Sequence, residues 1–150
     1  MQSMTPEELL TKIRNGRYGD RDFTQPMFKV ISVTDGCDPM YHEFFGDYYE
    51  ETLNHAGKLT EYIVEFKSDK REKATLQESF RLTHTIKGAS ATMGFMTIAV
   101  VAEGLESLFR SVKDGEFALE GDMIEIIEDS IAWIGLRLEE IKLEIPTPEA

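Results

Sequence analysis

The chain has 150 residues, 41% of them hydrophobic, with 16 basic and 28 acidic side chains for a net charge of -12. This is enough for one domain with a real core, and the negative charge argues against nucleic acid or an anionic membrane surface as a partner. Cys37 is the only cysteine, which excludes an internal disulfide framework, and no apolar run approaches the ~20 residues that span a bilayer. Because residues 1–10 are polar and acidic where a signal peptide is basic and then apolar, we expect a cytoplasmic protein.

Residues 1–40 are predicted to form an N-terminal extension whose role the sequence does not reveal. Thr5 begins a short predicted helix as its N-cap, and residues 26–33 are rich in β-branched side chains, which is typical of one strand or an extended arm. A lone strand cannot form a sheet. The extension therefore either drapes over the rest of the chain, pairs with another chain or stays partly mobile, and the composition changes near Asp38.

Four amphipathic helices are predicted after this boundary, over residues 38–66, 74–93, 97–112 and 122–144. Asp38 is the expected N-cap of the first, and Gly94 supplies the left-handed stop after the second. The predicted apolar stripe of the first helix contains Phe45, Tyr49, Leu53, Ala56, Leu59, Ile63 and Phe66. Short connections between helices of similar length predict an all-α, antiparallel up-down-up-down four-helix bundle over residues 41–144, and 145–150 begin a linker or C-terminal tail.

His84 is predicted to face solvent from the middle of the second helix. An inward stripe with steps of four and three contains Thr75, Ser79, Leu82, Ile86, Ala89 and Met93. His84 lies on the opposite side, where Lys87 and Gly88 are its neighbours one turn along the helix. Gln77, Arg81 and Ala91 complete the outer face, and we expect Arg81, Gly88 and Ala91 to contact a partner.

Gly88 is unusual because a glycine inside a helix costs roughly 1 kcal/mol relative to alanine. The simplest explanation is access, since the missing side chain lets a protein surface or a phosphoryl group reach the imidazole. Lys87 adds a point charge for phosphate oxygens. A neutral imidazole nitrogen is a good nucleophile near pH 7, so these three residues favour phosphoryl transfer.

The pattern His84-x-x-Lys87-Gly88, followed by Gly94, resembles the signature of histidine phosphotransfer (HPt) domains. The sequence His-Thr-Ile-Lys-Gly, followed by Thr-Met-Gly-Phe, is most similar to the N-terminal phosphotransfer domain of CheA-type chemotaxis histidine kinases. The likeness runs from about Tyr41 to Glu144. The resemblance implies that His84 accepts a phosphoryl group from an ATP-binding histidine kinase domain, in cis or in trans. It also implies transfer onward to an aspartate of a response-regulator receiver domain.

The third helix offers two carboxylates that could hold the imidazole, Glu103 and Glu106. A carboxylate that accepts the proton-bearing nitrogen fixes the tautomer and strengthens the other nitrogen as a nucleophile. In the family, a glutamate of this helix plays that part, and an alignment without gaps from His84 puts it at Glu106. Where the family often has a second histidine, this chain has Glu103, which predicts an extra negative charge near the site.

The chain is expected to bind no cofactor itself. It has no Gly-x-x-x-x-Gly-Lys-Ser/Thr loop or other glycine-rich phosphate cradle, so ATP and Mg²⁺ are expected on the partner kinase domain. A carboxylate-bridged metal bundle needs Glu-x-x-His motifs, and no histidine here has a glutamate three residues before it. The alternative of another class is a helical adaptor that binds signalling partners through its acidic surface and does no chemistry.

Overall fold

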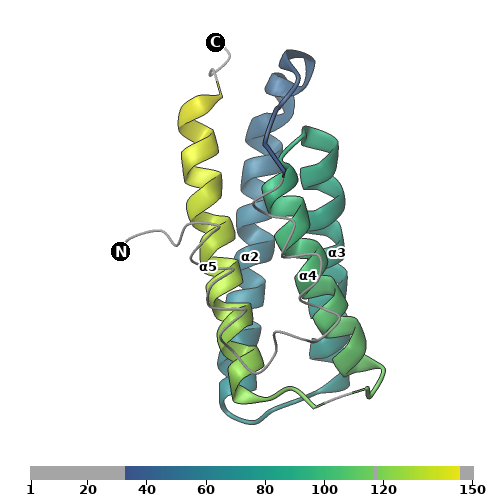
Figure 1. Cartoon of the computed structure of the whole chain (residues 1–150). Coiled ribbons are helices and arrows are strands. Elements are labelled where there is room, and N and C mark those ends of the chain that lie inside the picture. Colours follow the sequence, from purple (N-terminus) through teal and green to yellow (C-terminus); the bar gives the residue numbers. More distant parts are fainter. Residues whose placement is uncertain (1–32, 117, 146–150) are drawn as a thin grey trace.

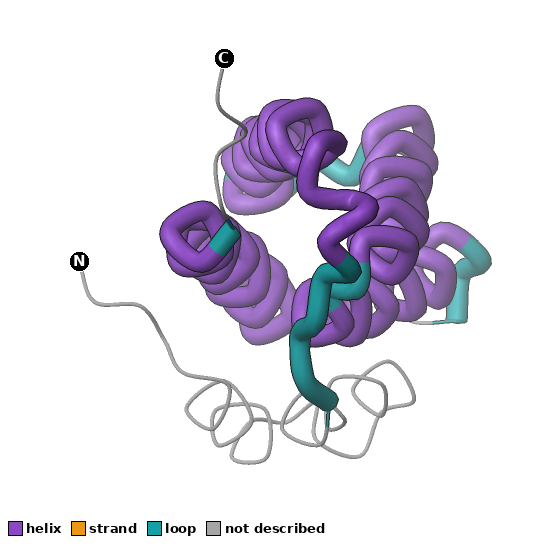
Figure 2. The backbone as a smooth tube through the Cα atoms, turned by 90° about the horizontal axis from the view of Figure 1, so that it is seen from above, coloured by secondary structure: helices purple, strands orange, loops and turns teal. Residues whose placement is uncertain are grey.

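The computed structural model describes residues 33–116 and 118–145. A 3₁₀ turn, η3 (Pro39–Phe44), leads into four α-helices: α2 (Phe45–Lys67), α3 (Lys73–Met93), α4 (Met96–Lys113) and α5 (Gly121–Glu144). Successive helices run in opposite directions, and they pack around a common centre (Figures 1 and 2). The predicted all-α antiparallel bundle is thus confirmed. The helix expected from Thr5, most of the arm at 26–33 and the tail at 146–150 lie outside the described residues.

The start of the first long helix follows the predicted cap but not the predicted helix type. The Asp38 side chain accepts from the Met40 N–H at 3.0 Å, and Pro39 is the first residue of the turn. The Tyr41 N–H donates to the Asp38 carbonyl three residues back, which is the 3₁₀ pattern common at helix ends. The α-helix proper therefore begins at Phe45.

The core-facing stripe of α2 differs from the predicted one at two positions, where Tyr48 and Thr52 are buried instead of Tyr49 and Leu53. The Tyr48 ring packs against Phe95 with centroids 5.2 Å apart. Its hydroxyl shares a 2.8 Å hydrogen bond with Ser90 of α3, so the polar end of the side chain has a partner inside the core. Burial raises the Tyr48 pKa to about 12, although the Ser90 bond acts in the opposite direction.

The turn between α3 and α4 brings these two helices side by side. Gly94 has φ of 88°, the left-handed conformation that ends α3. A Cβ on Gly94 would lie 2.1 Å from the Gly36 carbonyl oxygen, and the Gly36 N–H donates to the Gly94 carbonyl at 3.0 Å. Glycine is therefore required here both by the backbone angle and by the chain that crosses the turn.

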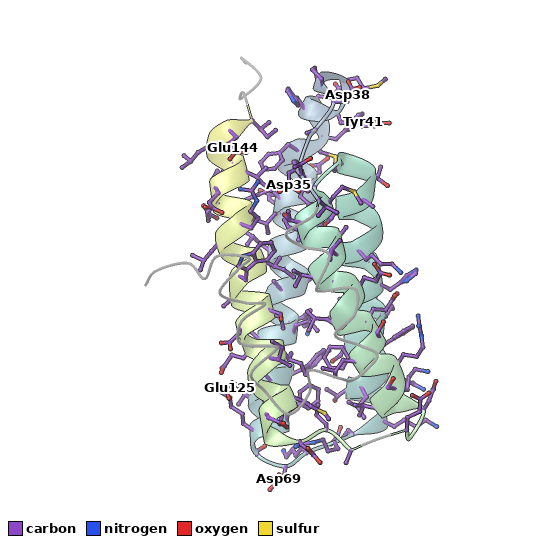
Figure 3. All side chains as sticks on the ribbon, in the orientation of Figure 1. Asp35, Asp38, Tyr41, Asp69, Glu125 and Glu144 are labelled. Carbon is purple, nitrogen blue, oxygen red and sulfur yellow. The ribbon has the colours of Figure 1, made fainter. Side chains whose placement is uncertain are left out.

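Asp35 fastens this crossing chain to two helices (Figure 3). The Thr97 N–H donates to Asp35 Oδ1 at 2.9 Å, and the Thr97 hydroxyl donates to Oδ2 at 2.7 Å. From α5, Arg137 donates to Oδ2 through Nε at 2.9 Å and Nη2 at 2.7 Å. A carboxylate from outside the helix thus caps the start of α4 and ties it to α5.

Charge is unevenly distributed between the two halves of the bundle. Helices α2 and α5 contain 12 acidic and 4 basic side chains, whereas α3 and α4 contain 3 acidic and 5 basic ones. The face built by α3 and α4 is therefore the less acidic one in an acidic chain. None of the described helices combines the length and apolar character needed to cross a bilayer.

Candidate functional site

His84 lies in the middle of α3, on the side of that helix turned away from the core. The buried stripe of α3 consists of Thr75, Leu76, Ser79, Leu82, Thr83, Ile86, Ser90 and Met93. It contains five of the six residues predicted from the spacing, and Ala89 lies at its edge. The His84 side chain is 64% exposed, so another protein can reach its imidazole ring.

Glu106 of α4 holds the imidazole from inside. His84 Nδ1 is hydrogen-bonded to Glu106 Oε2, and the Glu106 side chain is only 3% exposed. Burial alone raises a carboxyl pKa, but hydrogen bonds from Lys87 and His84 outweigh it and hold the Glu106 pKa below its ordinary value. Glu106 is therefore ionised at neutral pH, and an ionised carboxylate can only accept hydrogen bonds. That assigns the ring proton to Nδ1 and leaves the lone pair on Nε2.

Two cations balance the second oxygen of the same carboxylate. Lys87 Nζ lies 2.7 Å from Glu106 Oε1, and Arg110 Nη2 lies 3.6 Å from it. Lys87 was expected to supply charge for phosphate oxygens, and the structure shows that it also keeps the orienting carboxylate in place. His84, Lys87 and Glu106 are thus brought together. Helix spacing predicted the first two as neighbours, and the alignment to the family predicted the third.

Phe80, Arg110 and Lys113 are neighbours of this group that sequence reasoning missed. The Phe80 ring is nearly parallel to the imidazole, with an interplanar angle of 18° and centroids 6.4 Å apart. The guanidinium carbon of Arg110 lies 5.4 Å from the Phe80 centroid, and Lys113 Nζ lies 5.3 Å from it. The available signal was spacing, since Phe80 is four residues before His84, and Arg110 is four after Glu106.

The three residues predicted to contact a partner share the exposed side of α3. A Cβ added to Gly88 would meet no atom within 4 Å, so the surface beside His84 is open. Arg81 is paired with Glu78 of its own helix through a 3.0 Å bond from Nε. Ala91 is exposed. Their contact with a partner stays a prediction.

Glu103 is half-buried on α4, and within the part of the chain that the structure describes its side chain forms no hydrogen bond or ion pair. Of the two candidate carboxylates, it is Glu106 that reaches His84. Among the described residues, no group of three or more His, Cys, Asp or Glu side chains is arranged to hold a metal ion.

Comparison with known proteins gives this site a family. Residues 43–142 match the sequence profile of the Hpt domain. The chain belongs to the Hpt domain family. Asp35 and Gly36, which contact the α3–α4 turn, lie before the matched residues.

Several chemotaxis proteins are similar to this Hpt domain. It is 29% identical over 89 residues to the chemotaxis protein CheA of Borreliella burgdorferi, covering 59% of the present chain and 10% of that protein. It is 30% identical over 80 residues to CheA of Listeria monocytogenes, covering 53% of the chain and 13% of that protein. The chain thus spans a small part of these curated relatives.

A solved structure has the same fold. The CheA phosphotransferase domain from Thermotoga maritima aligns with a TM-score of 0.64 and 24% identity over 68% of this chain and 97% of that domain. The solved structure confirms the predicted fold, and the profile match together with the similar CheA proteins confirms the predicted Hpt domain of CheA type.

Proposed function

We propose that His84 Nε2 is the phosphoacceptor, which takes a phosphoryl group from ATP held by a histidine kinase domain and passes it to an aspartate of a response-regulator receiver. The observation that carries this proposal is the pairing of an exposed imidazole with a buried, ionised carboxylate on its Nδ1. That arrangement leaves one nitrogen, the accessible one, free to attack.

In the first step, the Nε2 lone pair attacks the γ-phosphorus of ATP, an N–P bond forms, and the P–O bond to ADP breaks. The ring keeps its proton on Nδ1 and gains positive charge as the bond forms. Glu106 stabilises this developing charge because it is already ionised and within hydrogen-bonding distance. In the second step His84 Nε2 is the leaving group instead of the nucleophile. The receiver's carboxylate attacks phosphorus, the N–P bond breaks, and Nε2 leaves as a neutral imidazole nitrogen.

Lys87 is proposed to bind first Glu106 and then the phosphoryl group. Its Nζ holds Glu106 Oε1 at 2.7 Å in the resting domain, and its side chain is 32% exposed. An ammonium in this position is close enough to solvent to turn toward the phosphoryl oxygens while Arg110 stays near the carboxylate. ATP and Mg²⁺ belong to the kinase domain, because the chain has no phosphate-binding loop.

The receiver is proposed to dock on the exposed face of α3 around Gly88. Open space over Gly88 allows a partner's backbone to approach the imidazole closely. The lower density of acidic side chains on α3 and α4 also suits a partner that brings its own carboxylate.

The test is to incubate the chain with the dimerisation and ATP-binding domains of a chemotaxis kinase and with Mg-ATP labelled at the γ-phosphate. We expect label that is lost in acid and stable in base, and we expect its absence from His84→Gln. His42→Gln and His55→Gln are matched controls, because neither histidine is followed by both a lysine three residues later and a glycine four residues later. Both variants should label normally. Label that persists in His84→Gln would overturn the assignment, and a partner-dependent response that survives it would favour the helical adaptor.

A further inference from the structure

The proposed transfer uses His84, Glu106 and Lys87, but it leaves three contacts beside the imidazole unexplained. These are the nearly parallel Phe80 ring and the two cations that lie over it, Arg110 and Lys113. Phe80 comes from α3 and both cations come from α4, so the cluster bridges the helix pair that forms the site.

We infer that Phe80 is a positioning residue for phosphoryl transfer: its ring steadies the His84 imidazole and holds Arg110 and Lys113 where they bind the phosphoryl oxygens. This inference rests on the proposed function, because it assumes that His84 carries the phosphoryl group. It adds the residues that neutralise the charge of that group.

The first argument concerns the two cations. Cationic side chains are attracted to the face of an aromatic ring within about 6 Å of its centroid. Arg110 and Lys113 both meet this condition on one ring, at 5.4 and 5.3 Å. The attraction of both cations to the Phe80 ring thus offsets part of their mutual repulsion and keeps them beside His84.

The second argument concerns what the cations are free to do. The Arg110 guanidinium is 3.6 Å from Glu106 Oε1, which is longer than a hydrogen bond, and its side chain is 52% exposed. Lys113 Nζ donates one hydrogen bond to Asp114 Oδ1 at 3.2 Å, which leaves its other two N–H donors. Most of the five N–H donors of Arg110 are therefore available to the oxygens of a phosphoryl group on Nε2.

The third argument concerns the imidazole itself. Glu106 constrains only the Nδ1 side of the ring and leaves rotation about that hydrogen bond. The Phe80 ring, four residues earlier on the same helix, is nearly parallel to the imidazole at 18°, with the two centroids 6.4 Å apart. Carboxylate and phenyl ring together fix both the direction of Nε2 and the plane of attack.

The test uses the whole chain and phosphoramidate, a small phosphoryl donor that needs no docking to a kinase. His84 Nε2 attacks its phosphorus, the P–N bond breaks, and ammonia leaves. We expect Arg110→Gln and Lys113→Gln each to slow the initial rate about two- to fivefold, because each removes one solvent-exposed charge interaction with the phosphoryl oxygens. Phe80→Leu should slow the reaction about tenfold, since it affects both cations and the imidazole, and Phe80→Tyr should restore a rate within twofold of wild type.

A double-mutant cycle separates positioning from general packing. If Phe80 acts by holding Arg110, then Arg110→Gln should change the rate less than twofold in the Phe80→Leu background. Phe44→Leu is the matched control, because Phe44 is 51% exposed and lies in η3, and it should react like wild type. Thermal unfolding of each variant checks that the bundle is intact.

A folded Phe80→Leu variant that reacts at the wild-type rate would overturn the inference, as would effects of Phe80→Leu and Arg110→Gln that multiply fully. A defect seen with the kinase domain but not with phosphoramidate would overturn it too, since Phe80 would then serve docking. In each of these cases His84→Gln still blocks labelling. Phosphorylation of His84→Gln by phosphoramidate would instead count against the proposed function itself.

Discussion

Replacing Glu106 by glutamine should make His84 Nε2 a poor nucleophile while the imidazole itself stays in place. Glutamine has the same shape but offers one acceptor oxygen and one NH₂ group. If its oxygen keeps the 2.7 Å bond from Lys87, its NH₂ faces His84 Nδ1 and donates to it. The ring proton then moves to Nε2, so the exposed nitrogen loses the lone pair needed for attack.

The size of the effect follows from the bonds that are lost. Glu106 accepts two charge-assisted hydrogen bonds, and bonds of this kind contribute about 1.5–3 kcal/mol each. Only the one to His84 strengthens as positive charge develops on the ring. With about 1.4 kcal/mol for each factor of ten, phosphorylation should fall about ten- to a hundredfold. Glu103→Gln, on the same helix but without a bond to the imidazole, should change the rate less than about threefold.

Two measurements check this prediction. Initial rates with labelled ATP and a kinase domain give the kinetic effect, and ¹⁵N shifts of the imidazole report which nitrogen carries the proton. Because the folded-state pKa of Glu106 is lowered, its ionised form contributes stability above the ordinary carboxyl pKa, and this contribution is lost as pH falls through the folded pKa. The difference in Tm between wild type and Glu106→Gln should therefore shrink in acid. A larger kinetic effect from Glu103→Gln, or an unchanged tautomer in Glu106→Gln, would refute the reasoning.

Three further substitutions address Lys87, Gly88 and Gly94. Lys87→Ala should slow phosphorylation several-fold while the unfolding free energy changes by less than about 1 kcal/mol, since the side chain is partly solvated; equal rates at low and high salt would contradict it. Gly88→Leu should raise stability by about 0.5–1 kcal/mol, because nothing obstructs the new side chain, yet weaken receiver binding at least tenfold in calorimetry; a variant that melts lower and still transfers would assign the glycine to packing. Gly94→Ala should lower the unfolding free energy by about 2–4 kcal/mol in urea titrations, owing to its positive φ and the Gly36 carbonyl, and wild-type stability would show that the turn can relax.

Local spacing predicted the helices and most of the site because the information needed was local. The exposure of His84 and its proximity to Lys87 follow from the 3.6-residue period, and Gly94 marks the end of α3 through a conformation that few other residues adopt. Glu106 needed more, namely the antiparallel packing of α4 beside α3 and an alignment to the family. A periodicity argument alone left both glutamates as candidates.

Features that depend on distant partners were not predicted. Tyr48, rather than Tyr49, turns inward because a buried Ser90 hydroxyl 42 residues away satisfies its polar end. The cluster of Phe80, Arg110 and Lys113 was missed because the spacing of each residue is equally typical of a solvated helix face. Only the packing of α3 on α4 distinguishes these possibilities.

The Asp35 contacts have a consequence for where a fragment of this domain should begin. The family match begins at residue 43, but the cap of α4 and the partner of Arg137 come from eight residues earlier, 62 and 102 positions away from the residues they bind. A fragment begun at the family boundary would lose the carboxylate that joins the two helices, and it would leave the Thr97 N–H in the first turn of α4 without this acceptor. The physical unit of folding therefore starts before the unit that sequence families recognise, and expression fragments of this domain should include Asp35.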